Sequence, residues 1–298
     1  MISSLGSTLT RAGRPVSRRI LFQSFSSSSS SAQSPLVTTE HLPDDDRIAL
    51  VKLHNGPANA LSLEFCKALS ETIQTLEHDG TTQAMILQSG LPNRIFSAGL
   101  DISKELHEPD SDRLPEFWKA FQQVFLDLYG TQNLTTIAGL EGPAPAGGCM
   151  LVLSCDYRIA PQTNPKAVIG LNESQLGIVA PPWMCRQYID VLGHRQAELA
   201  LMEGRLFAPQ QALELGLVDE LDDEVQQAAI AKAKEFNQIP QSARAAVKQL
   251  TRKPLLDSLV KDRQRDIDFF CNFVTSPQAQ TAIGRYLQAM AAGKSKSK

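Results

Sequence analysis

The spacing of apolar residues predicts strands that alternate with helices in the first half of the chain. In "RIALVKLHN", apolar Ile48, Leu50 and Leu53 stand among polar neighbours, which is typical of a strand. The segment 62–79 then carries apolar residues at helical spacing, with Ser62 placed as its N-cap. The same criteria predict a buried strand at 84–89, a helix at 116–130, and strands at 135–142 and 157–160, with an apolar helix between the last two.

After the Pro181-Pro182 pair the pattern becomes almost entirely helical. Predicted helices are Met184–Leu192, Arg195–Glu203, Pro209–Leu215, Glu224–Phe236 and Ala243–Leu250, with two more from about Leu255. Strands mixed with helices, followed by helices alone, indicate an α/β core with a helical C-terminal region. We therefore expect a leader at 1–39, a core at 40–235 and a helical region at 236–298.

The predicted leader has a composition of its own. It contains no Asp or Glu, four arginines and many serines, which culminate in "SFSSSSSSAQS". An Arg-rich, Ser-rich, acid-free N-terminus is typical of a mitochondrial transit peptide, so we expect the mitochondrial matrix as the destination. The alternative is a disordered low-complexity tail that carries no address.

Charge and cysteine content argue against several classes of partner and site. The formal net charge of −3 does not indicate a basic surface for nucleic acid. The five cysteines are scattered and form no C-x-x-C pair, and the five histidines form no cluster with metal-ligand spacing, so we expect no metal site. No uncharged apolar run has the length of about 18 residues that a membrane-spanning helix needs. The phosphate-binding, nucleophile-elbow and zinc-protease motifs are also absent from the sequence.

One carboxylate lies inside an apolar run. Glu173 occurs in "VIGLNESQLGI", which carries no other charge. Burying an ionised carboxylate is costly unless it is paired, so this residue serves either the fold or the chemistry.

Two glycine-bearing turns are the other candidates for chemistry. In "FSAGLD", Gly99 permits a tight turn that exposes the backbone N–H of Leu100, and in "PAPAGGCM" Gly147 stands where a strand gives way to a helix. Two backbone donors aimed at one point would form an oxyanion hole. Ordinary turns explain the same glycines equally well.

Taken together with the glutamate, these segments resemble the crotonase (enoyl-CoA hydratase/isomerase) superfamily. The motifs "FSAGLD", "PAPAGGCMLVLSCDYRIA", "GLNESQLGI" and "GRLFAPQQALELGLVDEL" occur in that order, and the resemblance extends from about residue 47 to 290. It implies an α/β spiral of β-β-α units with a C-terminal helical region used in trimerisation, and hence a homotrimer.

The resemblance also implies where an acyl-CoA substrate lies. The thioester carbonyl is expected between the N–H groups of Leu100 and Gly147. The segment Ala98, Gly99, Leu100, Asp101 and Ile102 is expected to line the coenzyme A and acyl site, and the loop Asn55–Ser62 to contact coenzyme A. Coenzyme A is part of the substrate, and no further cofactor is implied.

One departure from the family pattern favours an isomerase. Hydratases of this family use two glutamates, and the position of the first is Met150 here, which cannot transfer a proton. A single carboxylate suffices to move a proton from C2 to C4 of a cis or trans 3-enoyl-CoA, giving the trans-2-enoyl-CoA of fatty-acid β-oxidation. Glu173 is the expected catalytic residue, and Asn172 either orients the site or has a turn or capping role.

Two other functions remain open from the sequence. The chain could be another acyl-CoA enzyme of this fold, such as a hydratase, hydrolase or decarboxylase, although Met150 argues against hydration. It could also be a non-catalytic member that binds acyl-CoA or RNA. Retention of Glu173, Gly147 and Gly148 argues against a lost active site.

Overall fold

A computed structural model describes residues 34–296 of the chain, so the predicted transit peptide lies outside the described residues. The strand β1 (Val37–Leu42) starts before Glu40, so the expected boundary of the leader falls inside an ordered strand. Among residues 34–296 no helix combines the length and apolarity needed to cross a membrane.

The main sheet is mostly parallel and has six strands in the order β1-β2-β3-β4-β6-β8. Only β1 runs antiparallel, pairing with β2 at one edge. A second, two-stranded parallel sheet pairs β5 with β7. The strands are β1 (Val37–Leu42), β2 (Asp45–Leu53), β3 (Ala84–Ser89), β4 (Thr135–Gly139), β5 (Ala144–Pro145), β6 (Tyr157–Ala160), β7 (Ile169–Gly170) and β8 (Glu220–Leu221).

Helices and helical turns separate most of these strands. They are α1 (Leu63–His78), η1 (Ile102–Leu106), α2 (Arg113–Tyr129), α3 (Gly147–Ser154), η2 (Glu173–Leu176), α4 (Pro182–Leu192), α5 (His194–Glu203), α6 (Pro209–Glu214), α7 (Val225–Phe236), α8 (Gln241–Val274) and α9 (Pro277–Lys296). Helix α1 begins as predicted, with Ser62 as N-cap accepting the N–H of Phe65.

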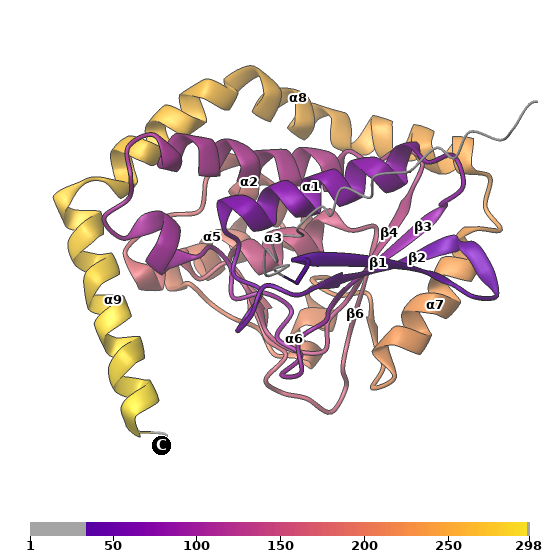
Figure 1. Ribbon diagram of the computed structural model, residues 1–298, viewed down its shortest axis with the longest axis horizontal. Helices are drawn as coiled ribbons and strands as arrows, with labels where there is room; N and C mark the ends of the chain where they lie inside the picture. The colour runs from indigo at the N-terminus through magenta and orange to yellow at the C-terminus, as the bar shows by residue number, and fades with distance from the viewer. Residues whose placement is uncertain (1–33, 297–298) are drawn as a thin grey trace, which may run out of the picture. The chain divides into compact units, whose positions relative to one another are not determined.

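Both faces of the main sheet are covered, as parallel sheets require. Figure 1 shows α1 and α2 on one side of the sheet and α7 on the other. Ile48 and Leu50 pack toward α7, whereas Ala49 and Val51 belong to the core beneath α1 and α2. The strand predicted at 47–55 is therefore confirmed, but it is buried on two faces and not on the single face that its alternation suggested.

The helical C-terminal region is confirmed, but its division is not. In place of a helix ending at Leu250 and two more from about Leu255, α8 runs unbroken for 34 residues through Pro254. Proline removes the N–H that would bond the carbonyl of Leu250. The side chain of Leu250 is 80% exposed, so this turn faces solvent, where water can satisfy the carbonyl.

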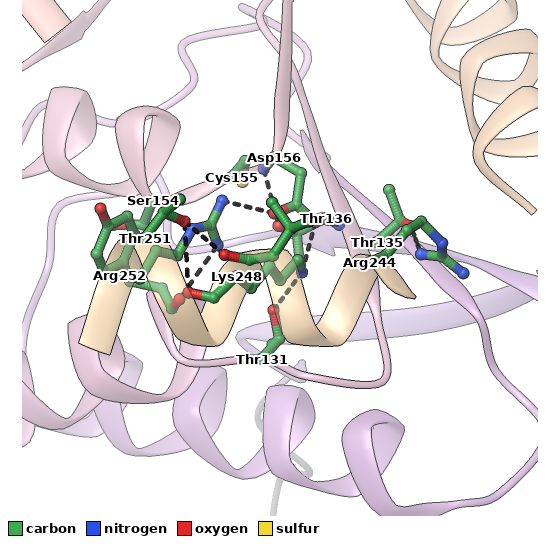
Figure 2. Close-up of polar contacts among 12 residues, drawn as sticks. Thr131, Thr135, Thr136, Ser154, Cys155, Asp156, Arg244, Lys248, Thr251 and Arg252 are labelled. Atoms are coloured by element: carbon green, nitrogen blue, oxygen red, sulfur yellow. Dashed lines mark hydrogen bonds and ion pairs between the residues drawn. The ribbon is translucent and has the colours of Figure 1, made fainter. Parts of the chain in front are cut away.

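A buried ion cluster anchors the first half of α8 to the core (Figure 2). Asp156 lies between Lys248 Nζ at 2.6 Å and Arg252 Nη2 at 2.6 Å. Lys248 also donates to the carbonyl of Leu134 at 2.6 Å, and Asp156 accepts the N–H of Thr136 at 2.8 Å. Because every charged group here has a partner, the cluster is able to stay desolvated.

Candidate active site

Glu173 is buried at the start of the short 3-10 turn η2. The residue is only 7% exposed, and its neighbours along the chain, Ile169, Leu171, Leu176 and Ile178, are buried as well. Burial raises the pKa of this carboxyl to about 7, an effect that its own backbone N–H partly offsets. Within residues 34–296 its Oε2 atom accepts no hydrogen bond. A buried carboxyl with one oxygen left without a hydrogen-bond partner serves proton transfer better than it serves stability.

The turn that carries Glu173 is fixed on both sides. Its carbonyl accepts the N–H of Ile178 at 3.2 Å, and the turn ends at Gly177 in the left-handed conformation. A β-carbon on Gly177 would lie 2.8 Å from Cβ of Ala282, so only glycine allows α9 to approach this closely. The C-terminal helix of the same chain therefore covers the turn.

The Gly147 turn lies beside the strand that leads to Glu173. Ala146 precedes α3 with φ 51° and ψ −119°, a conformation that is strained for a residue with a side chain. Two hydrogen bonds hold it there: its N–H donates to the carbonyl of Gly170 at 2.8 Å, and its carbonyl accepts the N–H of Met150 at 3.1 Å. Gly147 is then the first residue of α3, and its N–H finds no acceptor in the described part of the chain.

Leu100 presents a second free N–H. An isolated parallel bridge pairs it with Leu61, in which the N–H of Leu61 donates to Gly99 at 2.8 Å and the N–H of Asp101 donates to Leu61 at 3.0 Å. Because donors alternate in direction along an extended segment, the N–H of Leu100 points away from Leu61. It has no acceptor within residues 34–296.

The two turns touch through their glycines. Gly99 has φ +83°, and a β-carbon there would lie 3.0 Å from Cβ of Ala146 and 3.3 Å from the nitrogen of Gly147. The sequence prediction that these turns come together is therefore supported by their packing. Two free peptide donors at adjacent turns, one of them at a helix N-terminus, favour a negatively charged oxygen.

The other residues predicted for the substrate site, in the segment 98–102, make contacts with the neighbouring loop and turn. Ala98 donates its N–H to the carbonyl of Ala58 at 2.9 Å, which joins the segment 98–102 to the loop Asn55–Ser62. Asp101 turns its carboxylate back onto η1, where it accepts the N–H of Lys104 at 3.1 Å. Ile102 is half-buried at the first position of that turn.

Asn172 does not cap the turn with its side chain. It occupies the N-cap position of η2, but its side chain makes no capping hydrogen bond. Its Oδ1 atom is buried and accepts no hydrogen bond within the described residues. Side-chain capping by Asn172 is therefore wrong. Its backbone carbonyl does take part in the turn, where it accepts the N–H of Gln175 at 3.1 Å, and an orienting role for its side chain stays a prediction.

Met150 is fully buried in α3, three residues after Gly147, and offers no ionisable group. Within residues 34–296 no group of three or more His, Cys, Asp or Glu side chains is arranged to hold a metal ion. The arrangement is thus one buried carboxyl of raised pKa on the segment after β7 and two backbone donors at the neighbouring turns.

Two positions that shape this site escaped the sequence analysis. Ala146 carries no signal, because alanine does not mark a positive φ in the way glycine does. Glu105 is the other, with a side chain that is completely buried just beyond Leu100. Its signal was the arginine eight positions later, Arg113, which binds it.

Comparison with known proteins agrees with this geometry. The family model described as enoyl-CoA hydratase/isomerase matches residues 44–292. The chain belongs to the enoyl-CoA hydratase/isomerase family. Residues 44–292 include every predicted site residue, and the crotonase fold expected from the motifs is confirmed.

Relatives within this family include mitochondrial enoyl-CoA delta isomerase 1 of two mammals. The rat protein is 42% identical over 245 residues, which cover 82% of this chain and 83% of the relative. The human protein is 39% identical and the match covers 82% of this chain and 80% of the relative.

Solved structures agree in fold. Human mitochondrial delta3-delta2-enoyl-CoA isomerase superposes with a TM-score of 0.83 at 38% identity, covering 87% of this chain and 99% of that one. An enoyl-CoA hydratase from Bacillus halodurans gives a TM-score of 0.74 at 24% identity, covering 84% of this chain and 99% of that one. The latter match speaks for the fold alone.

Proposed function

We propose that this chain is an enoyl-CoA delta isomerase, which converts cis or trans 3-enoyl-CoA into trans-2-enoyl-CoA in fatty-acid β-oxidation. The observation that carries the proposal is the buried carboxyl of Glu173, whose Oε2 atom has no hydrogen-bond partner within the described residues, with Met150 at the position where a hydratase of this family would have its other acid. The relatives named as mitochondrial enoyl-CoA delta isomerase 1 support the same reaction.

The first chemical step is removal of a proton from C2. The C–H electron pair moves into the thioester, so negative charge develops on the carbonyl oxygen and a dienolate forms. The N–H groups of Leu100 and Gly147 would bind that oxygen, and each such donor contributes about 3 kcal/mol in comparable sites. The Glu173 carboxylate takes the proton and becomes a neutral acid.

The second step returns the proton at C4. The dienolate electrons close the carbonyl again, place the double bond between C2 and C3, and form the new C–H bond at C4. Glu173 leaves the step as a carboxylate, so atoms and charge balance without another reactant. A pKa of about 7 suits both halves of the cycle, because neither the protonated nor the ionised form is strongly favoured at neutral pH.

The binding site follows from the same geometry. Coenzyme A would contact the segment Ala98–Ile102 and the loop Asn55–Ser62, with Asn172 helping to orient the substrate. Coenzyme A enters and leaves as part of the substrate, and the reaction requires no redox cofactor or metal.

Location and assembly complete the proposal. The relatives are named as mitochondrial, which supports a mitochondrial protein, and the acid-free leader supports import to the matrix by a transit peptide. We also expect a homotrimer, which light scattering on the purified chain would test. Exposed apolar side chains along α8, such as Val247, Val260 and Phe269, support an interface on that helix.

The decisive experiment offers the purified chain a 3-enoyl-CoA and a 2-enoyl-CoA in separate reactions. Isomerisation leaves the mass unchanged and creates a conjugated thioester with a new ultraviolet absorbance, whereas hydration adds the mass of water. We expect rapid conversion of the first substrate and negligible hydration of the second. Rapid hydration of the 2-enoyl-CoA would exclude the isomerase in favour of a hydratase.

A further inference from the structure

Glu105 is a buried carboxylate that the proposed mechanism does not use. It lies in the π-helical turn η1, which begins two residues after Leu100, and its side chain has no exposed surface. A buried carboxylate persists only with partners, because desolvation of an unpaired charge is costly. What Glu105 binds therefore indicates its role.

Its partners come from the starts of two helices. Oε1 accepts the N–H of Leu63, the first residue of α1, at 3.0 Å. Arg113, the first residue of α2, binds both oxygens of the carboxylate, with Nη2 at 2.7 Å from Oε1 and Nε at 3.0 Å from Oε2. A two-pronged guanidinium contact of this kind fixes orientation as well as distance.

An outer layer of charge holds Arg113 in turn. Glu64 lies 2.9 Å from Arg113 Nη1 and 2.8 Å from Lys104 Nζ. These two cations lower the pKa of the Glu64 carboxyl to about 2. Arg113 is therefore held by two carboxylates, the exposed Glu64 and the buried Glu105.

Two hydrogen-bonded contacts thus join the segment 99–105 to the segment 61–63. The first is the backbone bridge between Leu61 and Leu100, whose two hydrogen bonds measure 2.8 and 3.0 Å. The second is the bond from Leu63 to Glu105. Leu100 lies at the first of these contacts, and the second holds the far end of the same segment against the start of α1.

We infer that Glu105, locked by Arg113, is a positioning residue that sets the direction of the Leu100 N–H toward the substrate carbonyl. The inference rests on the proposed function, because it assumes that this N–H binds a thioester. Oxyanion donors act only when they are already aimed at the developing charge, and a displacement of about 1 Å can cost about 10²-fold in rate. Glu105 touches no reacting atom and acts through the backbone alone.

A buried carboxylate elsewhere in the chain provides the matched control. Asp156 is also held by two cations, Lys248 and Arg252 of α8, and accepts a backbone N–H (Figure 2). It follows the C-terminal end of α3, whereas Gly147 is the first residue of that helix. Asp156→Asn therefore removes a buried charge and loosens the fold without touching either oxyanion donor.

The test compares Glu105→Gln and Asp156→Asn in the full chain. Glu105→Gln keeps the shape of the side chain, but it replaces one acceptor oxygen by an NH2 group that faces an Arg113 donor. Arg113→Lys tests the same contact by removing the two-pronged donor. The probe is octanoyl-CoA labelled with ¹³C at the thioester carbonyl, which is saturated and cannot react. Infrared difference spectra report how strongly the oxyanion hole polarises that carbonyl, independently of any turnover.

In the wild-type chain we expect binding to lower the carbonyl stretching frequency. Glu105→Gln and Arg113→Lys should each lose at least half of that shift and lower kcat for 3-enoyl-CoA by about 10²-fold. KM and the pH midpoint of the reaction should change little. Asp156→Asn should keep the full shift and the wild-type kcat at temperatures where circular dichroism shows it folded.

Three results would overturn the inference. One is a folded Glu105→Gln chain with the wild-type shift and kcat, and if that variant does not fold, the same result for Arg113→Lys decides. Another is an equal loss of the shift in Asp156→Asn, and the third is a wild-type chain that binds octanoyl-CoA without any shift. A chain with the shift but no isomerase activity would instead contradict the proposed function, while the infrared comparison would still decide the role of Glu105.

Discussion

The nitrogen of Gly147 lies 3.3 Å from the point where a β-carbon on Gly99 would stand. These residues are far apart in sequence, and each belongs to a different turn, one ahead of η1 and one at the start of α3. Their contact packs the turn before Leu100 against the turn that carries the Gly147 N–H, and a side chain on Gly99 would fit only if its neighbours moved. The oxyanion hole of the proposed mechanism therefore depends on residue 99 having no β-carbon.

Replacing Gly99 by alanine should push the two turns apart. The added methyl would lie 3.0 Å from Cβ of Ala146 and 3.2 Å from the carbonyl of Pro145, at a φ of +83°. We expect kcat/KM for 3-enoyl-CoA to fall by about 10²-fold or more, measured on chains shown to be folded. Gly193→Ala is the matched control, since Gly193 has a φ of +76° and open space around its missing side chain.

Gly193→Ala should lose about 1 kcal/mol of stability and no activity, because strain without a clash affects only the fold.

Leu100→Ala separates the role of the side chain from that of the backbone, since it keeps the N–H that binds the oxyanion. It should reduce kcat far less than Gly99→Ala. Equal losses in both variants would contradict the assignment of the donor to the backbone.

Glu173→Gln should remove the isomerase activity while leaving acyl-CoA binding close to normal. Glutamine has nearly the same shape but cannot take up the C2 proton, and general acid–base groups contribute about 10² to 10⁴-fold in rate. Steady-state kinetics on 3-enoyl-CoA and calorimetric titration with octanoyl-CoA measure the two properties separately. Glu198→Gln makes the same chemical change in the exposed pair with Arg195 and should leave both unchanged. Residual activity above one tenth of wild type would rule out a single essential base.

Much of the fold was predictable because its strands and helices carry strong local patterns. The strand at 84–89 and the helix N-cap at Ser62 depend on neighbours in sequence, so they were read correctly from the chain alone. The continuity of α8 through Pro254 was not, because it depends on contacts with distant residues. Buried Leu255 and Leu259 after the proline, and the Asp156 cluster before it, hold the helix together across the missing hydrogen bond.

The site, like the fold, was only partly predictable from the sequence. Glu173 and the two glycine turns were found from residue type and order along the chain, and the structure brings the turns into contact. Ala146 and Glu105 were missed because their roles lie in a backbone angle and in a long-range pairing. Neither property is encoded in the identity of the residue itself.

The pH dependence of catalysis should follow Glu173. In the free chain this carboxyl must be ionised to accept the C2 proton, and burial raises its pKa to about 7. We expect kcat/KM to fall about tenfold per pH unit below about pH 7 and to level off above it. A profile that stays flat down to pH 5 would show that the base is a group with an ordinary carboxyl pKa.

The same carboxyl should make stability depend on pH in the opposite sense to most acidic residues. Its pKa rises from 4.5 in the unfolded chain to about 7 in the folded one, so the folded state holds the proton more tightly. That contribution is fully present below pH 4.5 and is lost as the pH rises through 7. Relative to wild type, Glu173→Gln should therefore gain up to about 3 kcal/mol in the free energy of unfolding between pH 4.5 and pH 8. Denaturant titrations of both chains at the two pH values measure the difference, and an unchanged difference would contradict the raised pKa.

Ala146→Gly should stabilise the fold, which is unusual for a substitution that removes a buried methyl group. Ala146 is held at φ 51° and ψ −119°. Such strain costs about 1 to 3 kcal/mol, whereas glycine adopts this conformation freely and loses about 0.5 to 1 kcal/mol in chain entropy and about 0.8 kcal/mol with the buried methyl group. We expect a net gain of about 0.5 kcal/mol in the free energy of unfolding, measured by urea denaturation.

Ala144→Gly, two residues earlier, removes a fully buried methyl from the strand β5, where the chain has no positive φ. It should destabilise the fold by about 1 kcal/mol, so the two variants should differ in sign. If Ala146→Gly also lowers kcat, the strained angle helps to aim the Gly147 N–H, because the freed turn keeps its hydrogen bonds but loses its rigidity. Destabilisation by both variants would mean that the backbone of Ala146 stores no strain.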